Sequence, residues 1–406
     1  MDADAFRNSP CGRVVPTIKG AWAYVPHPLP PPLDYSSLIS ILDRASMAVG
    51  ELRGMGYAVP NPYLLIRPLQ RKEAVASSRI EGTTTELSEL LLLEEGVDDS
   101  RRPSDTREVL NYVRALVHAI SRLGVLPVSS RLMNEAHAIL MQDVAVDRGA
   151  KYPPGEFRRD QNWIGLRGVD IKDARFVPPP VGEMTVALAE LEKYANKVQA
   201  DDTPDLIRAA LIHYQFEAIH PYPDGNGRIG RLLIPLYLAQ CGVLPQPLLY
   251  LSPFFERNRD EYLDRLLSVS RDGDWLGWIR FFLRGVIQQS GDAIIRMQKL
   301  RDLQSAYREK LHELSASGLP ARLIDHIFER PFVSVPIAMD VLRVTYPTAK
   351  AAIDRLVEAG VLDELKPRTK PKFFLAREVY RVIEANYVEG DEKPRRRPSV
   401  TRSRRR

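Results

Sequence analysis

Apolar residues recur at helical spacing along most of the chain. In residues 36–58, for example, the apolar positions fall on one face of a helix. The same period predicts further helices, over residues 68–81, 105–123, 129–144, 182–198, 203–219, 226–241, 256–270, 273–290 and from there to about 314. The Pro-rich residues 1–35 lack this period, and we expect them to be irregular. The pattern predicts a mainly α-helical protein.

Two local signals set helix boundaries near residue 80. Pro68 suits the first turn of the helix over residues 68–81, and Gly82 is the first breaker after it. Thr83 and Glu86 have the spacing of a capping box, which predicts that they open the next helix, through LSELLLLEE.

Residues 151–180 differ from the helical pattern. The stretches GEFRRDQNWIG and ARFVPPP read as two short extended segments joined by a polar turn. This predicts a β-hairpin within a helical protein.

Residues 319–386 read as a separate module. Three helical patterns are followed by an extended pair, VLDEL and KFFLA, with the basic KPRTKPK between them. Three helices and a basic hairpin are typical of a winged helix-turn-helix. We expect residues 291–318 to form a linker helix before this module and residues 387–406 to form a disordered tail.

The charge of the chain is concentrated in that tail. The net charge is +5, but the last fourteen residues hold eight basic residues and no acid, so the rest carries −3. Such a tail is typical of disorder. It could contact nucleic acid, or it could be a solvated end without a partner, and the sequence leaves both open.

Composition indicates an ordinary globular protein, 44% hydrophobic and 27% charged. The uncharged residues 232–251 are long enough to span a membrane, but their prolines, glutamines and Gly242 favour a buried helix followed by a buried loop. Two cysteines, Cys11 and Cys241, exclude a disulfide framework. The first residues lack the apolar stretch of a signal peptide. We expect a cytoplasmic protein without a membrane segment.

The stretch HPYPDGNGRIGR, residues 220–231, carries the chemistry. Prolines 221 and 223 end the preceding helix, and a new helix can begin near Asn226. The segment Gly225-Asn226-Gly227 therefore lies where open N–H groups and the positive end of a helix dipole attract an anion. Glycines let the backbone approach a phosphate closely.

Charged side chains complete this stretch. Arg228 and Arg231 share one helix face and suit phosphate oxygens. Asp224 supplies a carboxylate where Mg²⁺ sits beside phosphates, and His220 can take a proton near neutral pH. Base, metal carboxylate, anion cradle and cations are the parts of a nucleotidyl-transfer site. A tight turn with a surface histidine is the alternative, which the combination disfavours.

These residues match the signature of the Fic family, HxFx(D/E)GNGRxxR, except that Tyr222 stands where Phe is usual. HYQFEAIH, LYLSPFFERNRDEYLDRL and the hairpin segments also resemble bacterial Fic proteins with an N-terminal helical domain and a C-terminal winged helix. The resemblance implies a helical Fic core with a β-hairpin flap. It divides the chain into residues 1–100, 101–290, the linker, the winged helix and the tail.

The resemblance also implies roles. ATP and Mg²⁺ would be bound, with Asp224 holding the metal and His220 deprotonating a target hydroxyl that attacks the α-phosphate. Arg228 and Arg231 would bind the β- and γ-phosphates. The residues implied to contact ATP are Gly225, Asn226, Gly227, Arg228, Ile229, Gly230, Arg231, Asn258 and Tyr262. The flap over 158–178, with Gln161, Trp163, Ile164 and Phe176, would pin an extended target segment by strand addition.

A second motif, SSRIEG at residues 77–82, resembles the Fic inhibitory motif (S/T)xxxE(G/N). Ser77 and Glu81 share one helix face. The resemblance implies that Glu81 pairs with Arg231 and keeps it from the γ-phosphate. A capping box from Ser78 and a plain solvated charge are the alternatives. For His213, one helix before the motif, a packed core histidine is favoured over a role in the site.

The expected function is auto-inhibited transfer of AMP from ATP to a Ser, Thr or Tyr hydroxyl of a target protein, and of the chain itself. Three alternatives stay open: removal of AMP, transfer of another nucleotide or phosphate, and DNA-binding regulation through the winged helix or the tail. A homodimer is implied by the resemblance only.

Overall fold

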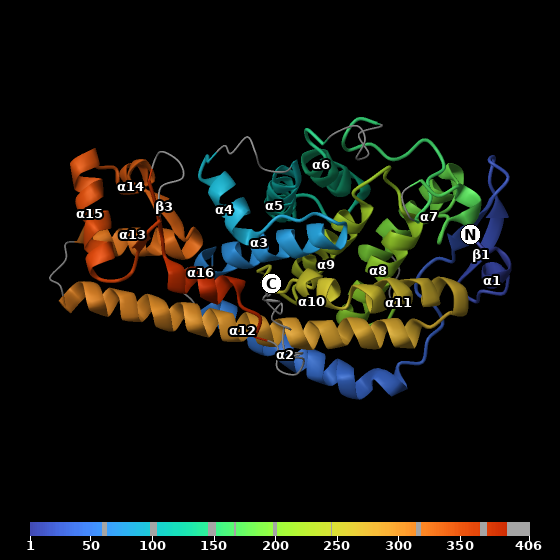
Figure 1. Cartoon of the computed structure of the whole chain (residues 1–406). Coiled ribbons are helices and arrows are strands. Elements are labelled where there is room, and N and C mark those ends of the chain that lie inside the picture. The colour runs from blue at the N-terminus through green and yellow to red at the C-terminus, as the bar shows by residue number, and fades with distance from the viewer. Residues whose placement is uncertain are drawn as a thin grey trace, which may run out of the picture.

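The computed structural model describes residues 1–58, 63–97, 104–144, 152–165, 168–197, 201–244, 246–313, 318–365 and 372–387. The chain is mainly α-helical, as its sequence predicts (Figure 1). None of the helices in these ranges combines the length and apolar character that crossing a membrane requires. The basic residues 366–371 and the tail after Tyr387 fall outside the described residues, so the expectations for them stay predictions. Tyr387 itself is ordered, and its N–H donates to Asp292 over 2.7 Å.

The N-terminal segment is ordered, and its expected irregularity was wrong. A short helix, α1 (Asp4–Arg7), precedes an antiparallel hairpin of β1 (Gly12–Pro16) and β2 (Trp22–Pro26). Prolines at the strand ends hide the pattern. The strands themselves carry β-branched and aromatic residues such as Val15 and Tyr24.

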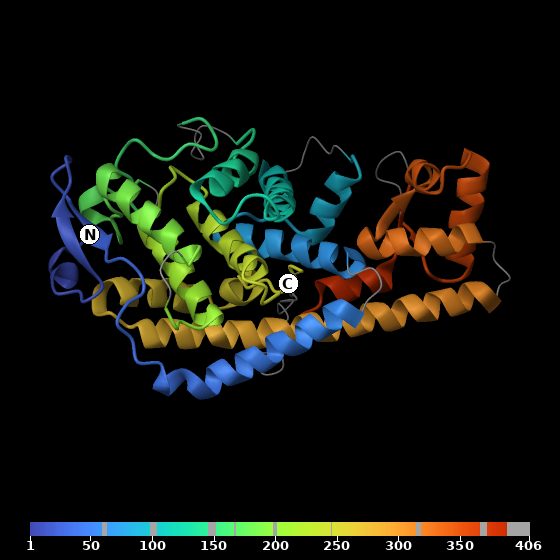
Figure 2. The same cartoon turned by 180° about the vertical axis from the view of Figure 1, so that it is seen from behind.

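Two long helices lie side by side along one edge of the molecule, α2 (Ile39–Ala58), after the turn η1 (Ser36–Leu38), and α12 (Trp275–Glu313) (Figure 2). The prediction of two helices over 273–314 was wrong, because α12 is continuous. Gly285 does not interrupt it; a Cβ there would lie 2.6 Å from the Phe254 ring, so the glycine makes room for packing. The expected linker helix is thus the second half of α12.

The remaining helices of the main body pack between these two and the hairpin. They are α3 (Tyr63–Ile80), α4 (Leu87–Glu94), α5 (Ser104–Arg122), α6 (Ser130–Leu140), η3 (Ile171–Asp173), α7 (Val181–Ala195), α8 (Asp205–Ile219), α9 (Asn226–Gln240), α10 (Ser252–Arg257) and α11 (Arg259–Asp272). Two boundary predictions were wrong. Pro68 lies inside α3, and the capping box of α4 is formed by Glu86 and Glu89 rather than Thr83 and Glu86.

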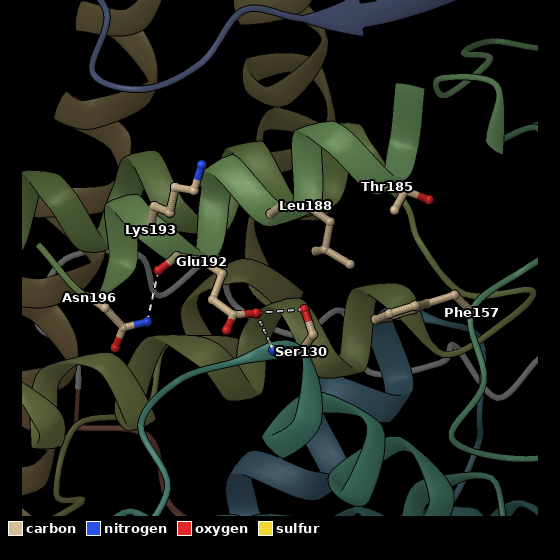
Figure 3. Close-up of a pocket in the computed structure, with 8 residues that line it drawn as sticks. Ser130, Phe157, Thr185, Leu188, Glu192, Lys193 and Asn196 are labelled. Atoms are coloured by element: carbon tan, nitrogen blue, oxygen red, sulfur yellow. Dashed lines mark hydrogen bonds between the residues drawn. The ribbon is translucent and has the colours of Figure 1, made fainter. Parts of the chain in front are cut away.

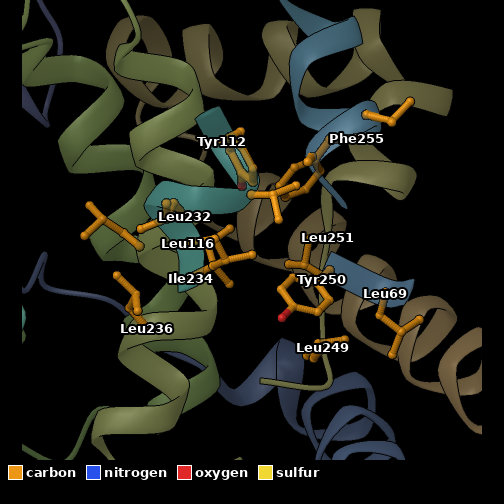
Figure 4. Packing of buried hydrophobic residues seen from close by; sticks show 14 of the residues in the cluster. Leu69, Tyr112, Leu116, Leu232, Ile234, Leu236, Leu249, Tyr250, Leu251 and Phe255 are labelled. Carbon is orange, nitrogen blue, oxygen red and sulfur yellow. The ribbon is translucent and has the colours of Figure 1, made fainter. Parts of the chain in front are cut away.

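The core is centred on α8 and α9. Nearly every residue of both helices is buried, which explains their lack of a polar face. Leu232, Ile234 and Leu236 of α9 are buried, and Figure 4 shows Ile234 beside Leu116 of α5, on the side of α9 that faces the buried loop over residues 248–251. The uncharged residues 232–251 are therefore a buried helix and loop, as predicted.

The C-terminal module has helices and strands where the sequence predicts them, with additions. The elements are α13 (Gly318–Glu329), β3 (Phe332–Ser334), α14 (Val335–Leu342), α15 (Tyr346–Glu358), β4 (Asp363–Glu364), β5 (Phe373–Leu375) and α16 (Arg377–Glu384). The strands form one antiparallel sheet in the order β3-β5-β4. Strand β3 and helix α16 were not predicted.

Candidate functional site

The segment HPYPDGNGRIGR forms the turn from α8 into α9. His220 caps the C-terminus of α8 with a φ of +50°, which a residue with a side chain seldom adopts. Gly225, with a φ of +77°, precedes the first residue of α9. The first N–H groups of a helix have no partners within it, so those of α9 are available at this turn to an anion.

His220 is held as a neutral imidazole. Its Nδ1 lies 3.3 Å from the Glu217 carbonyl, which fixes the proton on Nδ1 and leaves the lone pair on Nε2. Burial and the Arg158 guanidinium lower the pKa of His220 to about 4. Arg158 itself is buried, and its Nε donates to the His220 carbonyl over 2.9 Å. A free lone pair at neutral pH is what a general base needs.

The loop after His220 is held by the side chains of Asn226, which was expected to contact ATP, and of His137, for which no role was predicted. Both polar atoms of the Asn226 side chain bond to the backbone of Tyr222, each over 2.8 Å, so this amide fixes the loop. The His137 ring stacks on Tyr222 with centroids 3.9 Å apart. Because His137 Nδ1 accepts from Gly155 N–H, its Nε2 donates to the Asp224 carbonyl over 3.1 Å.

Asp224 is the candidate metal ligand. Its side chain is 39% exposed, and burial raises the pKa of its carboxyl. The described residues contain no group of three His, Cys, Asp or Glu side chains that could enclose a metal. One partly exposed carboxylate beside an anion site fits Mg²⁺, which takes its remaining ligands from phosphates and water.

The two arginines of α9 have different partners. Arg228 lies 3.2 Å from Glu108 of α5, and both side chains are buried. Arg231 donates from Nη2 to Glu81 Oε1 over 2.6 Å, and from Nε and Nη2 to the hydroxyl and carbonyl oxygens of Ser77, each over 2.9 Å. The buried Arg231 thus faces a Glu81 side chain that is 39% exposed.

The end of α3 explains why Glu81 points at this arginine. Gly82, with a φ of +100°, and Thr83 donate back to the carbonyls of Arg79 and Ser78 over 3.0 and 3.2 Å, which closes the helix in a Schellman motif. The carboxylate reaches the N-terminus of α9, where a Cβ at Gly227 would lie 2.2 Å from Glu81 Oε1. Burial raises the pKa of Glu81, but Arg231 outweighs it, and the net shift is downward.

A cavity of about 300 Å³ joins these groups. Its lining includes Glu81, His220, Gly227, Arg231 and Tyr262, with apolar residues of α11. His213 is fully buried, as favoured, and it supports this wall. Since its Nδ1 bonds the Gly230 carbonyl over 2.9 Å, its Nε2 accepts from the Tyr262 hydroxyl over 2.9 Å.

Glu217 also lines the cavity, and the sequence did not single it out. Within the described part of the chain its buried Oε1 has no hydrogen-bond partner. Burial raises the pKa of this carboxyl to about 8, so it is largely protonated at neutral pH. Its nearest neighbour on α9 is Gly230, where a Cβ would lie 2.2 Å away.

Comparison with known proteins identifies the fold around this site. The family description "Fic/DOC family N-terminal" matches residues 39–121, and "Fic/DOC family" matches residues 127–238. The chain thus carries both Fic/DOC domains. Glu81 lies in the first match and Arg231 in the second, so their ion pair joins the two Fic segments. Tyr262 and the C-terminal module lie beyond both.

Similar proteins agree with this family. "Protein adenylyltransferase Fic" of Aedes aegypti is 33% identical over 127 residues, 31% of this chain and 22% of that protein. The same-named protein of Drosophila grimshawi is 29% identical over 173 residues, 43% of this chain and 32% of that protein. The match thus spans a third or less of these relatives. A Fic family protein from Desulfovibrio desulfuricans shares the fold, with a TM-score of 0.55 at 19% identity over 86% of this chain and 98% of that chain.

The segment expected as the Fic flap is less regular than a hairpin. Ile164 and Phe176 form one antiparallel bridge, and no longer ladder occurs in the described residues 158–165 and 168–178. Gln161 donates to the Pro178 carbonyl over 2.8 Å, and Trp163 is 37% exposed. The N-terminal hairpin supports this segment through Tyr24, whose N–H bonds the Val177 carbonyl and whose ring contacts Phe176.

Two residues that the resemblance implies to contact ATP do not line the site cavity, and their contact with ATP stays a prediction. The Asn258 amide bonds the Phe254 carbonyl over 2.9 Å and does not line the site cavity, while Ile229 is buried in the core. The cavity of about 400 Å³ in Figure 3 lies between α6 and α7. The N–H and hydroxyl groups of Ser130 both donate to Glu192 Oε2, over 2.8 and 2.7 Å, so these residues of the lining are bonded to each other.

Proposed function

We propose that this Fic protein is an auto-inhibited protein adenylyltransferase, which transfers AMP from ATP to a Ser, Thr or Tyr hydroxyl of a target protein and of itself. The observation that carries the proposal is a single cavity lined by a neutral His220 and by the N-terminus of α9. In this cavity Glu81 is paired with Arg231. The names of the matched relatives support the same reaction.

In this reaction the target hydroxyl attacks the α-phosphate of ATP. Its proton passes to His220 Nε2, the new bond joins oxygen to phosphorus, and the bond to the β-phosphate breaks to release pyrophosphate. The N–H groups at the start of α9 hold phosphate oxygens, and Arg231 binds the γ-phosphate once Glu81 leaves. Mg²⁺, when held by Asp224, would neutralise charge on the phosphates.

Arg228 takes a smaller part than expected from its place in the motif. Its guanidinium is already paired with Glu108 in a buried contact. We therefore propose that Arg228 contributes positive electrostatic potential near the phosphates and makes no direct bond to them. Asn226 likewise acts through the loop that it fixes, and its backbone N–H takes the cradle role. Residues 158–178 would dock the target segment by strand addition, with Ile164 and Phe176 at the bridge.

The proposed organisation follows the family. The C-terminal module has the helices and three-stranded sheet of a winged helix, which supports that assignment. Both cysteines are free thiols, which supports a cytoplasmic location. Nucleic-acid binding by this module remains the second hypothesis. Of the basic residues that favour it, Lys366, Arg368 and Lys370 lie outside the described residues, while Lys372 is described and pairs with Glu364 over 2.7 Å.

The test uses ATP labelled at either the α- or the γ-phosphate. The full-length chain, its Glu81→Gly variant and its His220→Ala variant are each incubated with a bacterial lysate and with no added protein. We expect label from the α-phosphate only, strongest with Glu81→Gly and absent with His220→Ala. Transfer of γ-label would indicate phosphate transfer, and loss of label from pre-labelled protein would indicate AMP removal.

A further inference from the structure

Helix α3 connects the C-terminal module with the Fic site. In both views it runs from α13 and α16 toward α9 (Figures 1 and 2). Its last turn carries Ser77, and Glu81 follows directly, both on Arg231. Its first half contacts the module, and these contacts have no part in the proposed reaction.

Arg71 provides the first contact. Its Nη1 donates to the carbonyl of Glu329, the last residue of α13, over 3.0 Å. Its Nε lies 2.6 Å from Glu94 of α4, and the arginine is buried. One turn earlier, Arg67 pairs with the Glu329 carboxylate. The end of α13 is therefore bound to α3 through both its backbone and its side chain.

Lys72 provides the second contact. Its ammonium donates to the Ala385 carbonyl over 2.6 Å, the Asn386 side chain over 2.8 Å and the Glu384 carbonyl over 3.3 Å. These groups lie at the C-terminus of α16, where the carbonyls lack partners within the helix and the dipole favours a cation. Three acceptors around one ammonium make this a specific contact rather than a solvated charge.

The distance from this contact to the site is short and the connection is stiff. Glu81 follows Lys72 by nine positions, which is about 13–14 Å at the rise of an α-helix. Glu73 also binds α3 to the main body, through Ser252 and Tyr112. The helix is thus held from two sides, by Glu73 on the main body and by Arg67, Arg71 and Lys72 on the module.

We infer that Arg71 and Lys72 are positioning residues through which the C-terminal module holds α3 so that Glu81 stays on Arg231. Displacing the module from α3 then raises AMP transfer. The inference rests on the proposed function, because it concerns how the inhibited state of that same site is maintained. It makes the module a regulatory part of the enzyme whatever else it binds.

The experiment compares Lys72→Met with Lys350→Met in full-length protein, each in the parent and in the Glu81→Gly background. Methionine keeps most of the lysine stem and removes the charge. Lys350 pairs only with Asp354 on the exposed face of α15, which makes it a matched control. We expect Lys72→Met to raise label transfer about three- to tenfold in the parent, less than the roughly 10- to 100-fold that one charge-assisted contact covers, because Arg67 and Arg71 still bind α13 to α3. In the Glu81→Gly background we expect Lys72→Met to leave label transfer unchanged, because the ion pair between Glu81 and Arg231 is already absent.

Each outcome decides something different. Equal rises in both backgrounds, or none in the parent, would overturn the inference. If Glu81→Gly itself has no effect, the proposed inhibition fails instead. Hydrogen exchange gives a readout independent of activity: Lys72→Met should reduce the protection of amides 77–82, and Lys350→Met should not. Unchanged protection with an unchanged melting temperature would also refute the role of Lys72.

Discussion

The two ends of the HPYPDGNGRIGR segment are in opposite conditions. At the His220 end the imidazole is neutral, and its Nδ1 donates to the Glu217 carbonyl. Arg158 donates to the backbone carbonyl of His220. At the Arg231 end the guanidinium is covered by Ser77 and Glu81. Under the proposed function, one end is ready for proton transfer while the other is closed to phosphate. The proposed inhibition would therefore leave the base undisturbed.

The same contrast separates the two arginines. Arg228 and Glu108 are buried together, with side chains 4% and 7% exposed. The partner of Arg231 is 39% exposed and belongs to the end of a helix. A buried pair is costly to break, whereas a partly exposed one can open at moderate cost. Of the two cations, only Arg231 has the character of a switch.

The largest expected effect is at the base. His220→Ala should lower AMP transfer by about 10²–10⁴-fold, the usual contribution of general-base catalysis. ATP affinity should stay within about twofold, because in this scheme His220 makes no phosphate contact. Labelling and calorimetric binding are measured on one preparation in the Glu81→Gly background. Undiminished labelling would remove His220 from the mechanism.

The next effect concerns stability. Arg228→Met should lower the free energy of unfolding by about 3–5 kcal/mol, because it removes the cation from a buried carboxylate. Lys193→Met, which breaks an exposed pair with Glu190, should cost under about 1 kcal/mol. Urea titration of both variants checks this. A small loss for Arg228→Met would mean that the arginine is free to serve the phosphates.

The switch itself should have a smaller effect. Glu81→Gly should raise transfer about 10- to 100-fold, as expected for loss of a charge-assisted bond of about 1.5–3 kcal/mol. The double variant Glu81→Gly with Arg231→Ala should lose that gain, because the released arginine is the agent. Full activation in the double variant would show that Glu81 inhibits by another contact, such as direct blocking of the nucleotide.

Local sequence predicted the parts that depend on local chemistry. Prolines 221 and 223 and the glycines define the turn, and the helical period defines α8 and α9. The positions of Arg158, His137 and Glu217 around the turn could not be predicted, because their partners lie far away in sequence or on the next helix. His137 is an example, since its hydrogen-bond partners are the N–H of Gly155 and the carbonyl of Asp224.

In the fold, too, local sequence predicted the elements with a clear local pattern and missed the others. Helices with a clear period were predicted well, but the division of α12 after residue 290 was wrong, since the helix continues through Gly291. The hairpin of β1 and β2 was missed because prolines end both strands. The flap was predicted as more regular than it is.

The smallest effect is a pH dependence that should be nearly flat. Burial and Arg158 lower the pKa of His220 to about 4, so the neutral base persists as the pH falls and is lost only near pH 4. A histidine at its ordinary pKa of about 6.5 would lose about tenfold in its neutral form at one pH unit below that value. The rate of the Glu81→Gly variant at saturating ATP should therefore change less than twofold between about pH 5.5 and 8.

Arg158 offers the matched comparison for this profile. Arg158→Met removes a cation that lowers the pKa of His220, so the acid limb should move to higher pH; Arg158→Lys, which keeps the charge, should move it less. Dividing the transfer rate of each variant by that of its parent at every pH removes the contribution from the titration of ATP. A parent limb near pH 6.5 would show that His220 is more solvated than its burial indicates. A limb that stays in place in Arg158→Met would mean that the arginine acts on His220 only through the carbonyl it holds.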